Sequence, residues 1–87
     1  MQAPRITIYT KSRCPHCVRA KRLLEKKGVD YQEIDAERND ELRAWLVDKT
    51  GQMTVPQIFA GDRPLGGFSD IDALDRQGLL DPILRGE

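Results

Sequence analysis

The 87-residue chain carries 14 Lys/Arg and 14 Asp/Glu, a formal net charge of zero, and 39% of its residues are hydrophobic. This composition excludes a largely disordered chain and fits one small globular domain, residues 1–87. No apolar run approaches the roughly 20 residues of a membrane-spanning helix, and residues 1–9 lack the apolar core of a secretory signal. We therefore expect a cytoplasmic protein that does not insert into membranes.

Charge is unevenly distributed along the chain. Residues 1–31 carry eight Lys/Arg against two Asp/Glu, whereas residues 32–87 carry six against twelve. The basic half lacks the clustered basic runs typical of a nucleic-acid surface, so we do not expect nucleic acid as a partner. A positive field that favours a thiolate or an anionic substrate explains the asymmetry better.

The first third of the chain predicts a strand, a helix and a second strand. Residues Arg5–Tyr9 are β-branched and alternating, which indicates a strand. Apolar positions recur at helical spacing across Pro15–Lys27, and a glycine follows. Asp30–Asp35 alternates over a short stretch, and its position after a helix favours a strand. A helical crossover between two strands is typical of a parallel pair.

The middle of the chain predicts a second helix and a hairpin. Asn39 can cap a helix over Asp40–Thr50, which ends before a glycine. Two short strands, Gln57–Ala60 and Arg63–Leu65, flank the turn residues Gly61-Asp62. A tight turn makes these two strands antiparallel.

The last quarter predicts a third helix. Ser69 and Asp72 have the spacing of a capping box, so we expect the helix to open there and to end near Gly78. The tail after it is expected to add one more helical turn. The whole order, βαβαββα, predicts an α/β fold in which helices flank a small four-stranded mixed sheet.

The segment TKSRCPHC, residues 10–17, holds both cysteines and the single histidine of the chain. Pro15 suits the first turn of a helix, so Cys14 is placed at the helix N-terminus, where free amides and the helix dipole stabilise a thiolate. We predict that the pKa of the Cys14 thiol is depressed. Cys17 lies one turn further, with its Cα about 5 Å away, so the two can form a disulfide. We expect Cys14 to be the nucleophile and Cys17 the resolving thiol.

Other interpretations of this motif are weaker. A structural disulfide across so short a loop constrains the unfolded chain little. A structural zinc site needs four ligands, and the chain has no further cysteine or histidine beside Cys14, His16 and Cys17, so no metal is expected. Two interpretations of His16 remain open: a solvent-facing loop residue, or a group that tunes Cys14.

Three motifs together resemble the dithiol glutaredoxins: TKSRCPHC, TVPQIF at Thr54–Phe59, and GGFSD at Gly66–Asp70. The resemblance implies a thioredoxin-like fold and a glutathione-dependent thiol–disulfide oxidoreductase that reduces protein disulfides and glutathione mixed disulfides. Glutathione would be the co-substrate, with no tightly bound cofactor. A monomer is the default expectation.

The resemblance also implies a glutathione site. Pro56 should follow a cis peptide bond, and the backbone of Val55 should pair with the cysteine moiety of glutathione. Asp70 would hold the γ-glutamyl ammonium, and Lys11 would lie near the glycine carboxylate. The expected glutathione-binding residues are Lys11, His16, Thr54, Val55, Pro56, Gly67, Phe68, Ser69 and Asp70.

The sequence departs from the family pattern at three places beside this site, one of which is Phe68, where a cysteine is frequent in the family. His16 stands where tyrosine is common, which could shift the redox couple toward a stronger oxidant. Many members carry an arginine just before TVP, where this chain has the neutral Gln52 and Met53. Arg38 and Lys49 are the candidates to replace that charge toward the glycine carboxylate.

Two alternative functions stay open at this point. One is a glutaredoxin-like electron donor, for example to ribonucleotide reductase, that is itself reduced by thioredoxin reductase. The other is a carrier of a [2Fe–2S] cluster, held by Cys14 of two chains and by two glutathione molecules. The intact GGFSD segment disfavours the electron donor. The presence of Cys17 disfavours the cluster carrier, because a second thiol favours disulfide closure.

Overall fold

The computed structural model describes residues 3–87 and has the predicted element order. Every strand and the first two helices lie within one residue of their predicted bounds, and the tail forms a short fourth helix. The elements are β1 Ile6–Thr10, α1 Pro15–Lys26, β2 Tyr31–Asp35, α2 Asp40–Thr50, β3 Gln57–Ala60, β4 Arg63–Gly66, α3 Phe68–Arg76 and α4 Leu80–Arg85.

The four strands form one mixed sheet in the order β2-β1-β3-β4. β1 pairs in parallel with β2, placing Ile8 beside Glu33, and antiparallel with β3, placing Ile8 beside Ile58. β3 and β4 form the predicted antiparallel hairpin. β2 and β4 are therefore the edge strands, and β4 carries Pro64, which has no amide to donate.

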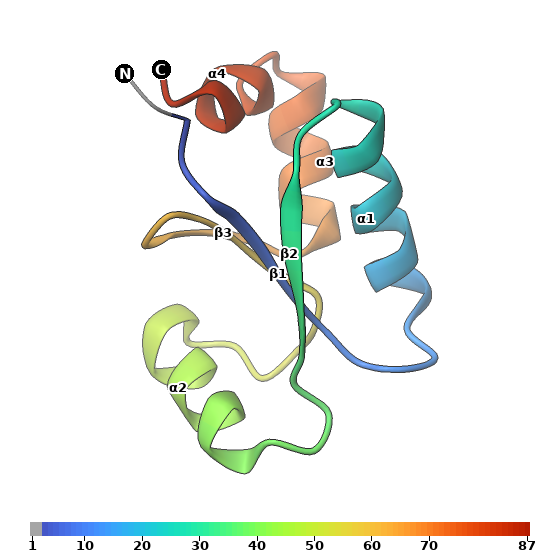
Figure 1. Ribbon diagram of the computed structural model, residues 1–87, viewed down its shortest axis with the longest axis vertical. Helices are drawn as coiled ribbons and strands as arrows, with labels where there is room; N and C mark the ends of the chain where they lie inside the picture. The colour runs from blue at the N-terminus through green and yellow to red at the C-terminus, as the bar shows by residue number, and fades with distance from the viewer. Residues whose placement is uncertain (1–2) are drawn as a thin grey trace.

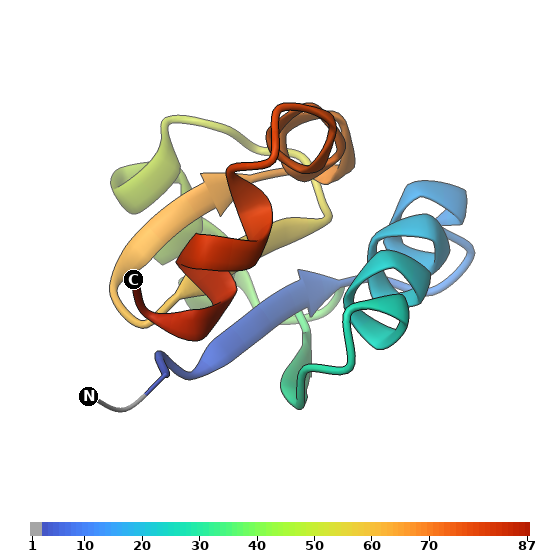
Figure 2. The same ribbon diagram turned by 90° about the horizontal axis from the view of Figure 1, so that it is seen from above.

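Helices cover both faces of the sheet. α1 and α3 lie side by side, whereas α2 lies apart from them (Figures 1 and 2). Because successive strand residues point to opposite faces, β1 contributes to two cores. The larger core joins Ile6 and Ile8 to residues of α1, α3 and α4, and the smaller joins Tyr9 to Phe59 and Leu46.

α1 begins at the cysteine motif for local reasons. Cys14 is its N-cap, with Sγ accepting a hydrogen bond from the Cys17 backbone N–H at 3.1 Å, and Pro15 is its first residue. Cys17, Ala20 and Leu24 are buried on one face. This spacing of three and four residues places the second cysteine toward the core, as the sequence predicts.

α3 begins differently from the sequence prediction. The capping box between Ser69 and Asp72 is wrong: the helix opens at Phe68, with Gly67 as N-cap. The carboxylate Oδ2 of Asp70 accepts the Gly67 backbone N–H at 2.9 Å, so the acid three residues after the cap supplies the hydrogen bond. A glycine has no capping side chain, and the sequence rule therefore selected the serine.

The C-terminal helix is held by an ion pair to one lysine and by two leucines in the core. Lys27 Nζ, just after α1, lies 2.5 Å from Asp75 Oδ1 of α3 and 3.0 Å from Asp81 Oδ1 of α4. Leu80 and Leu84 of α4 enter the larger core. Within residues 3–87, no helix combines the length and apolar character needed to cross a bilayer.

Candidate active site

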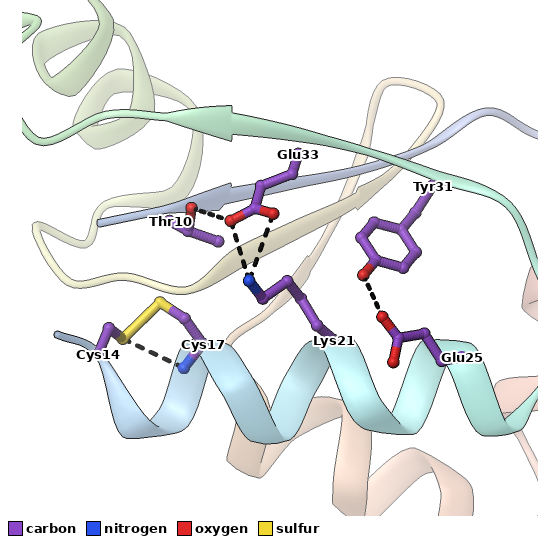
Figure 3. Close-up of polar contacts among 7 residues, drawn as sticks. All are labelled: Thr10, Cys14, Cys17, Lys21, Glu25, Tyr31 and Glu33. Atoms are coloured by element: carbon purple, nitrogen blue, oxygen red, sulfur yellow. Dashed lines mark hydrogen bonds and ion pairs between the residues drawn. A yellow bond between two sulfur atoms is a disulfide. The ribbon is translucent and has the colours of Figure 1, made fainter. Parts of the chain in front are cut away.

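Cys14 and Cys17 form a disulfide at the junction of β1 and α1, with Cα atoms 5.2 Å apart (Figure 3). Both residues are largely buried, and Cys14 is the more exposed at 7% against 2%. Cys14 is thus the more accessible sulfur-bearing residue, and the roles of nucleophile and resolving thiol stay predictions. The Cα separation lies inside the range of about 4.4–6.8 Å in which a disulfide can form.

The surroundings of Cys14 favour negative charge on its sulfur. The Cys17 amide already points at Cys14 Sγ from the first turn of α1. Cys14 lines a cavity of about 630 Å³ together with three cationic residues, Lys11, Arg13 and Lys21, and two carboxylates, Glu33 and Asp35. Arg13 has a φ of 56°, an uncommon backbone conformation for a non-glycine residue, in the loop that aims Cys14.

The TVP segment lies against the disulfide. The Val55–Pro56 peptide bond is cis, as the resemblance implied. The carbonyl oxygen of Val55 lies 3.9 Å from Cys14 Sγ, although the two residues are 41 positions apart. An oxidised sulfur has no proton to donate, so this is a contact of the two atoms and not a hydrogen bond.

The GGFSD segment completes the wall beside Pro56. A Cβ at Gly67 would lie 3.2 Å from the Pro56 carbonyl oxygen, so any larger residue would need the two backbones to move apart by a few tenths of an ångström. The ring of Phe68 stacks on that of His16, with centroids 6.3 Å apart and planes at 22°. All three sequence motifs therefore meet around the dithiol.

Lys11 and the TVP loop share a second cavity of about 400 Å³. Thr54, Val55 and Gln52 line it beside Lys11. Arg38 and Lys49, the residues expected to replace the missing arginine, do not line this cavity. Arg43, at the start of α2, lines it instead.

Arg43 also donates from Nη1 to the Glu37 carbonyl oxygen at 2.8 Å and pairs with Asp40. The sequence does not show that Arg43 lines this cavity, because the cavity forms only when α2 packs beside the TVP loop.

Sequence reasoning also missed a polar network beside the disulfide. Thr10 Oγ1 donates to Glu33 Oε2 at 2.8 Å, and Lys21 Nζ lies 3.2 Å from the same oxygen (Figure 3). These three side chains line the cavity that contains both cysteines. The hydrogen bond from Thr10, followed by that from Lys21, lowers the pKa of Glu33. The available signal was Lys21, four residues after Cys17 on the same helix face.

A helix-terminal Cys-X-X-Cys disulfide facing a cis-proline loop, on a mixed four-stranded sheet, defines a redox protein of the thioredoxin-like fold. The sequence model of the glutaredoxin family matches residues 6–65. The chain therefore belongs to the glutaredoxin family, a family of thiol–disulfide oxidoreductases.

Individual relatives agree over nearly the whole chain. A glutaredoxin of Pseudomonas aeruginosa is 52% identical over 81 residues, covering 93% of this chain and 96% of the relative. The solution structure of a Brucella melitensis glutaredoxin superimposes with a TM-score of 0.88 at 43% identity, covering 100% and 96% of the two chains. A crystal structure of a buckwheat glutaredoxin–glutathione complex superimposes with a TM-score of 0.86 at 32% identity, covering 93% and 76%.

Proposed function

We propose that the protein is a cytoplasmic oxidoreductase that uses glutathione to reduce protein disulfides and glutathione mixed disulfides. The observation that carries this proposal is the 3.9 Å approach of the Val55 carbonyl to Cys14 Sγ. A cysteinyl peptide whose sulfur reacts with Cys14 would find the backbone of Val55 within reach for strand-like pairing. The structural similarity to a glutaredoxin described as a glutathione complex supports glutathione as that peptide.

The proposed reduction of a protein disulfide has four exchange steps. The Cys14 thiolate attacks one sulfur, forms a mixed disulfide and releases the other sulfur as a thiolate that takes up a proton. Cys17 then attacks Cys14, releases the reduced substrate and closes the Cys14–Cys17 disulfide. One glutathione opens that disulfide at Cys14, and a second removes the first as glutathione disulfide. Two glutathione thiols thus supply the two electrons.

The proposed reduction of a glutathionylated protein is shorter. Cys14 takes the glutathionyl group and releases the protein thiol, and a second glutathione regenerates Cys14 as a thiolate. Cys17 makes no bond in this route. Its removal should therefore separate the two activities.

The expected glutathione groups fit the surroundings of the dithiol. The backbone of Val55 would pair with the cysteine moiety, and Lys11 would attract the glycine carboxylate in the cavity that it shares with Thr54. At the other end, the first-turn amides at Ser69 and Asp70 precede the first intrahelical bond of α3 and are oriented toward an anion. Asp70 would add a carboxylate for the γ-glutamyl ammonium.

His16 is proposed to form part of the rim of this groove, together with Phe68. Its ring is solvent-exposed and stacked on Phe68, which favours a contact surface for the substrate. The role of His16 in tuning Cys14 stays a prediction.

The test is glutathione-coupled reduction of a glutathionylated peptide, followed as NADPH consumption through glutathione reductase. We expect activity in the parent protein, loss in Cys14→Ser and retention in Cys17→Ser. With a protein disulfide as substrate, Cys17→Ser should lose most activity because the mixed disulfide is not resolved.

A parent that is inert with glutathione but turns over with thioredoxin reductase would replace this proposal with the electron-donor function. A brown protein with visible absorbance after anaerobic purification would indicate the cluster carrier instead.

A further inference from the structure

Gln57 is a buried polar side chain directly after the cis-proline. It begins β3, is 1% exposed, and lies opposite Tyr9 of β1. Its Nε2 donates to the Thr54 carbonyl oxygen at 2.9 Å and to Gln52 Oε1 at 3.0 Å. A backbone carbonyl only accepts hydrogen bonds, so the side-chain nitrogen must face Thr54.

Among the described residues, only the nitrogen end of the buried Gln57 amide is paired. Its Oε1 is buried and has no hydrogen-bond partner among residues 3–87. A buried acceptor without a partner destabilises a fold, and this offsets part of the stability that the two hydrogen bonds from Nε2 contribute. An unpaired buried acceptor calls for an explanation, and we look for it in the group that the amide nitrogen holds.

The bond from Gln57 fixes the peptide group that offers the Val55 amide. The Thr54 carbonyl and the Val55 N–H belong to one planar peptide, in which C=O and N–H of a trans bond point in opposite directions. The carbonyl is held inward by the buried amide of Gln57. The Val55 N–H is therefore directed away from Gln57, with its orientation set by a side chain that touches no substrate.

We propose that Gln57 is a positioning residue that orients the Val55 N–H for backbone pairing, and thereby favours disulfides that carry a peptide group over those that do not. This inference rests on the proposed function, because glutathione is the peptide that Val55 would bind. A hydrogen bond to the Thr54 oxygen also polarises the peptide and makes the Val55 N–H a stronger donor. Both effects act on substrate binding and leave the chemistry at Cys14 to other groups.

The experiment compares two disulfides in the Cys17→Ser background, where the reaction stops after the first exchange. Glutathione disulfide carries peptide groups and dithiodipyridine carries none. Both react through attack of the Cys14 thiolate on one sulfur and release of the other as a thiolate, so dividing one rate by the other removes the reactivity of Cys14. We expect this ratio to fall about fivefold to tenfold in Gln57→Met, the effect of one hydrogen bond.

Two matched variants make the result specific. Gln32→Met introduces the same change on the exposed edge strand β2 and should keep the ratio of the parent. In Gln57→Glu, a buried carboxyl beside the Thr54 oxygen has a raised pKa and donates only when protonated. Relative to the parent at each pH, its ratio should therefore rise as pH falls, a response that a purely structural role would not produce.

Each outcome decides between the claims. An unchanged ratio in Gln57→Met, or an equal loss of both rates, would overturn the positioning role, as would a Gln57→Glu ratio that does not vary with pH. A parent that reacts with dithiodipyridine but leaves glutathione disulfide intact would refute the proposed function, and this inference with it.

Discussion

Replacing Gly66 with alanine should destabilise the fold by an amount that can be estimated from two contributions. Gly66 has a φ of +102°, which an alanine adopts at a cost of about 1–2 kcal/mol. Its Cβ would also lie 2.7 Å from the Cβ of Asp70, so the side chain that caps α3 has to move. Loss of the hydrogen bond between Asp70 and Gly67 adds about 1 kcal/mol. We expect a loss of about 2–3 kcal/mol.

The assay is equilibrium urea unfolding, with Gly28→Ala as the matched control. Gly28 has a φ of +72°, and a Cβ added there would meet no atom within 4 Å, so that variant carries the backbone cost alone. A larger loss of unfolding free energy in Gly66→Ala than in Gly28→Ala is the result expected from the collision with Asp70. Equal losses of unfolding free energy would show that Asp70 yields freely, and would refute this account of how α3 begins.

Three further predictions concern single hydrogen bonds. The Thr10 hydrogen bond lowers the pKa of Glu33 and so favours its charged form. Glu33→Gln should therefore unfold with a lower free energy than the parent at neutral pH, and this difference should disappear as pH falls below 4.5. A difference in unfolding free energy that stays constant in urea titrations at acid pH would contradict this. The hydrogen bond to Glu25 raises the pKa of Tyr31 to about 12, so Glu25→Gln should shift tyrosinate absorbance toward pH 10.0, and an unmoved titration would argue against the bond. Asn39→Ala should lower the free energy of unfolding by about 1 kcal/mol, and Asn39→Asp by much less, because an aspartate can still accept the Leu42 N–H. Equal unfolding free energies of Asn39→Ala and the parent would show that the cap of α2 contributes nothing.

Local sequence patterns predicted what local physics determines. β1 and α1 follow from alternation and helical spacing, and the burial of Cys17 follows from its position on the same face as Ala20 and Leu24. The disulfide also follows, since residues three apart in a helix have the required separation. These features depend on a few neighbouring residues, so a single chain segment contains the information.

Features that depend on packing between distant segments were not predicted. Arg43 reaches the cavity beside Lys11 only because α2 lies next to the TVP loop, and Arg38 has an equally suitable sequence position. The hydrogen bond from Gln57 to Thr54 spans the turn that contains the cis peptide bond before Pro56, and hydrophobic periodicity encodes neither. The start of α3 failed for a third reason, because a glycine cap leaves no side-chain signal.

The edges of the sheet determine where an extended polypeptide can add to this molecule. β4 presents Pro64, which interrupts the row of amides, and β2 presents the exposed carboxylates Glu33 and Asp35. Proline and charge at sheet edges disfavour self-association through edge strands. Both outer strands therefore discourage aggregation with other extended chains, whereas the backbone pairing that we propose at Val55 would take place away from both edges, next to the reactive sulfur.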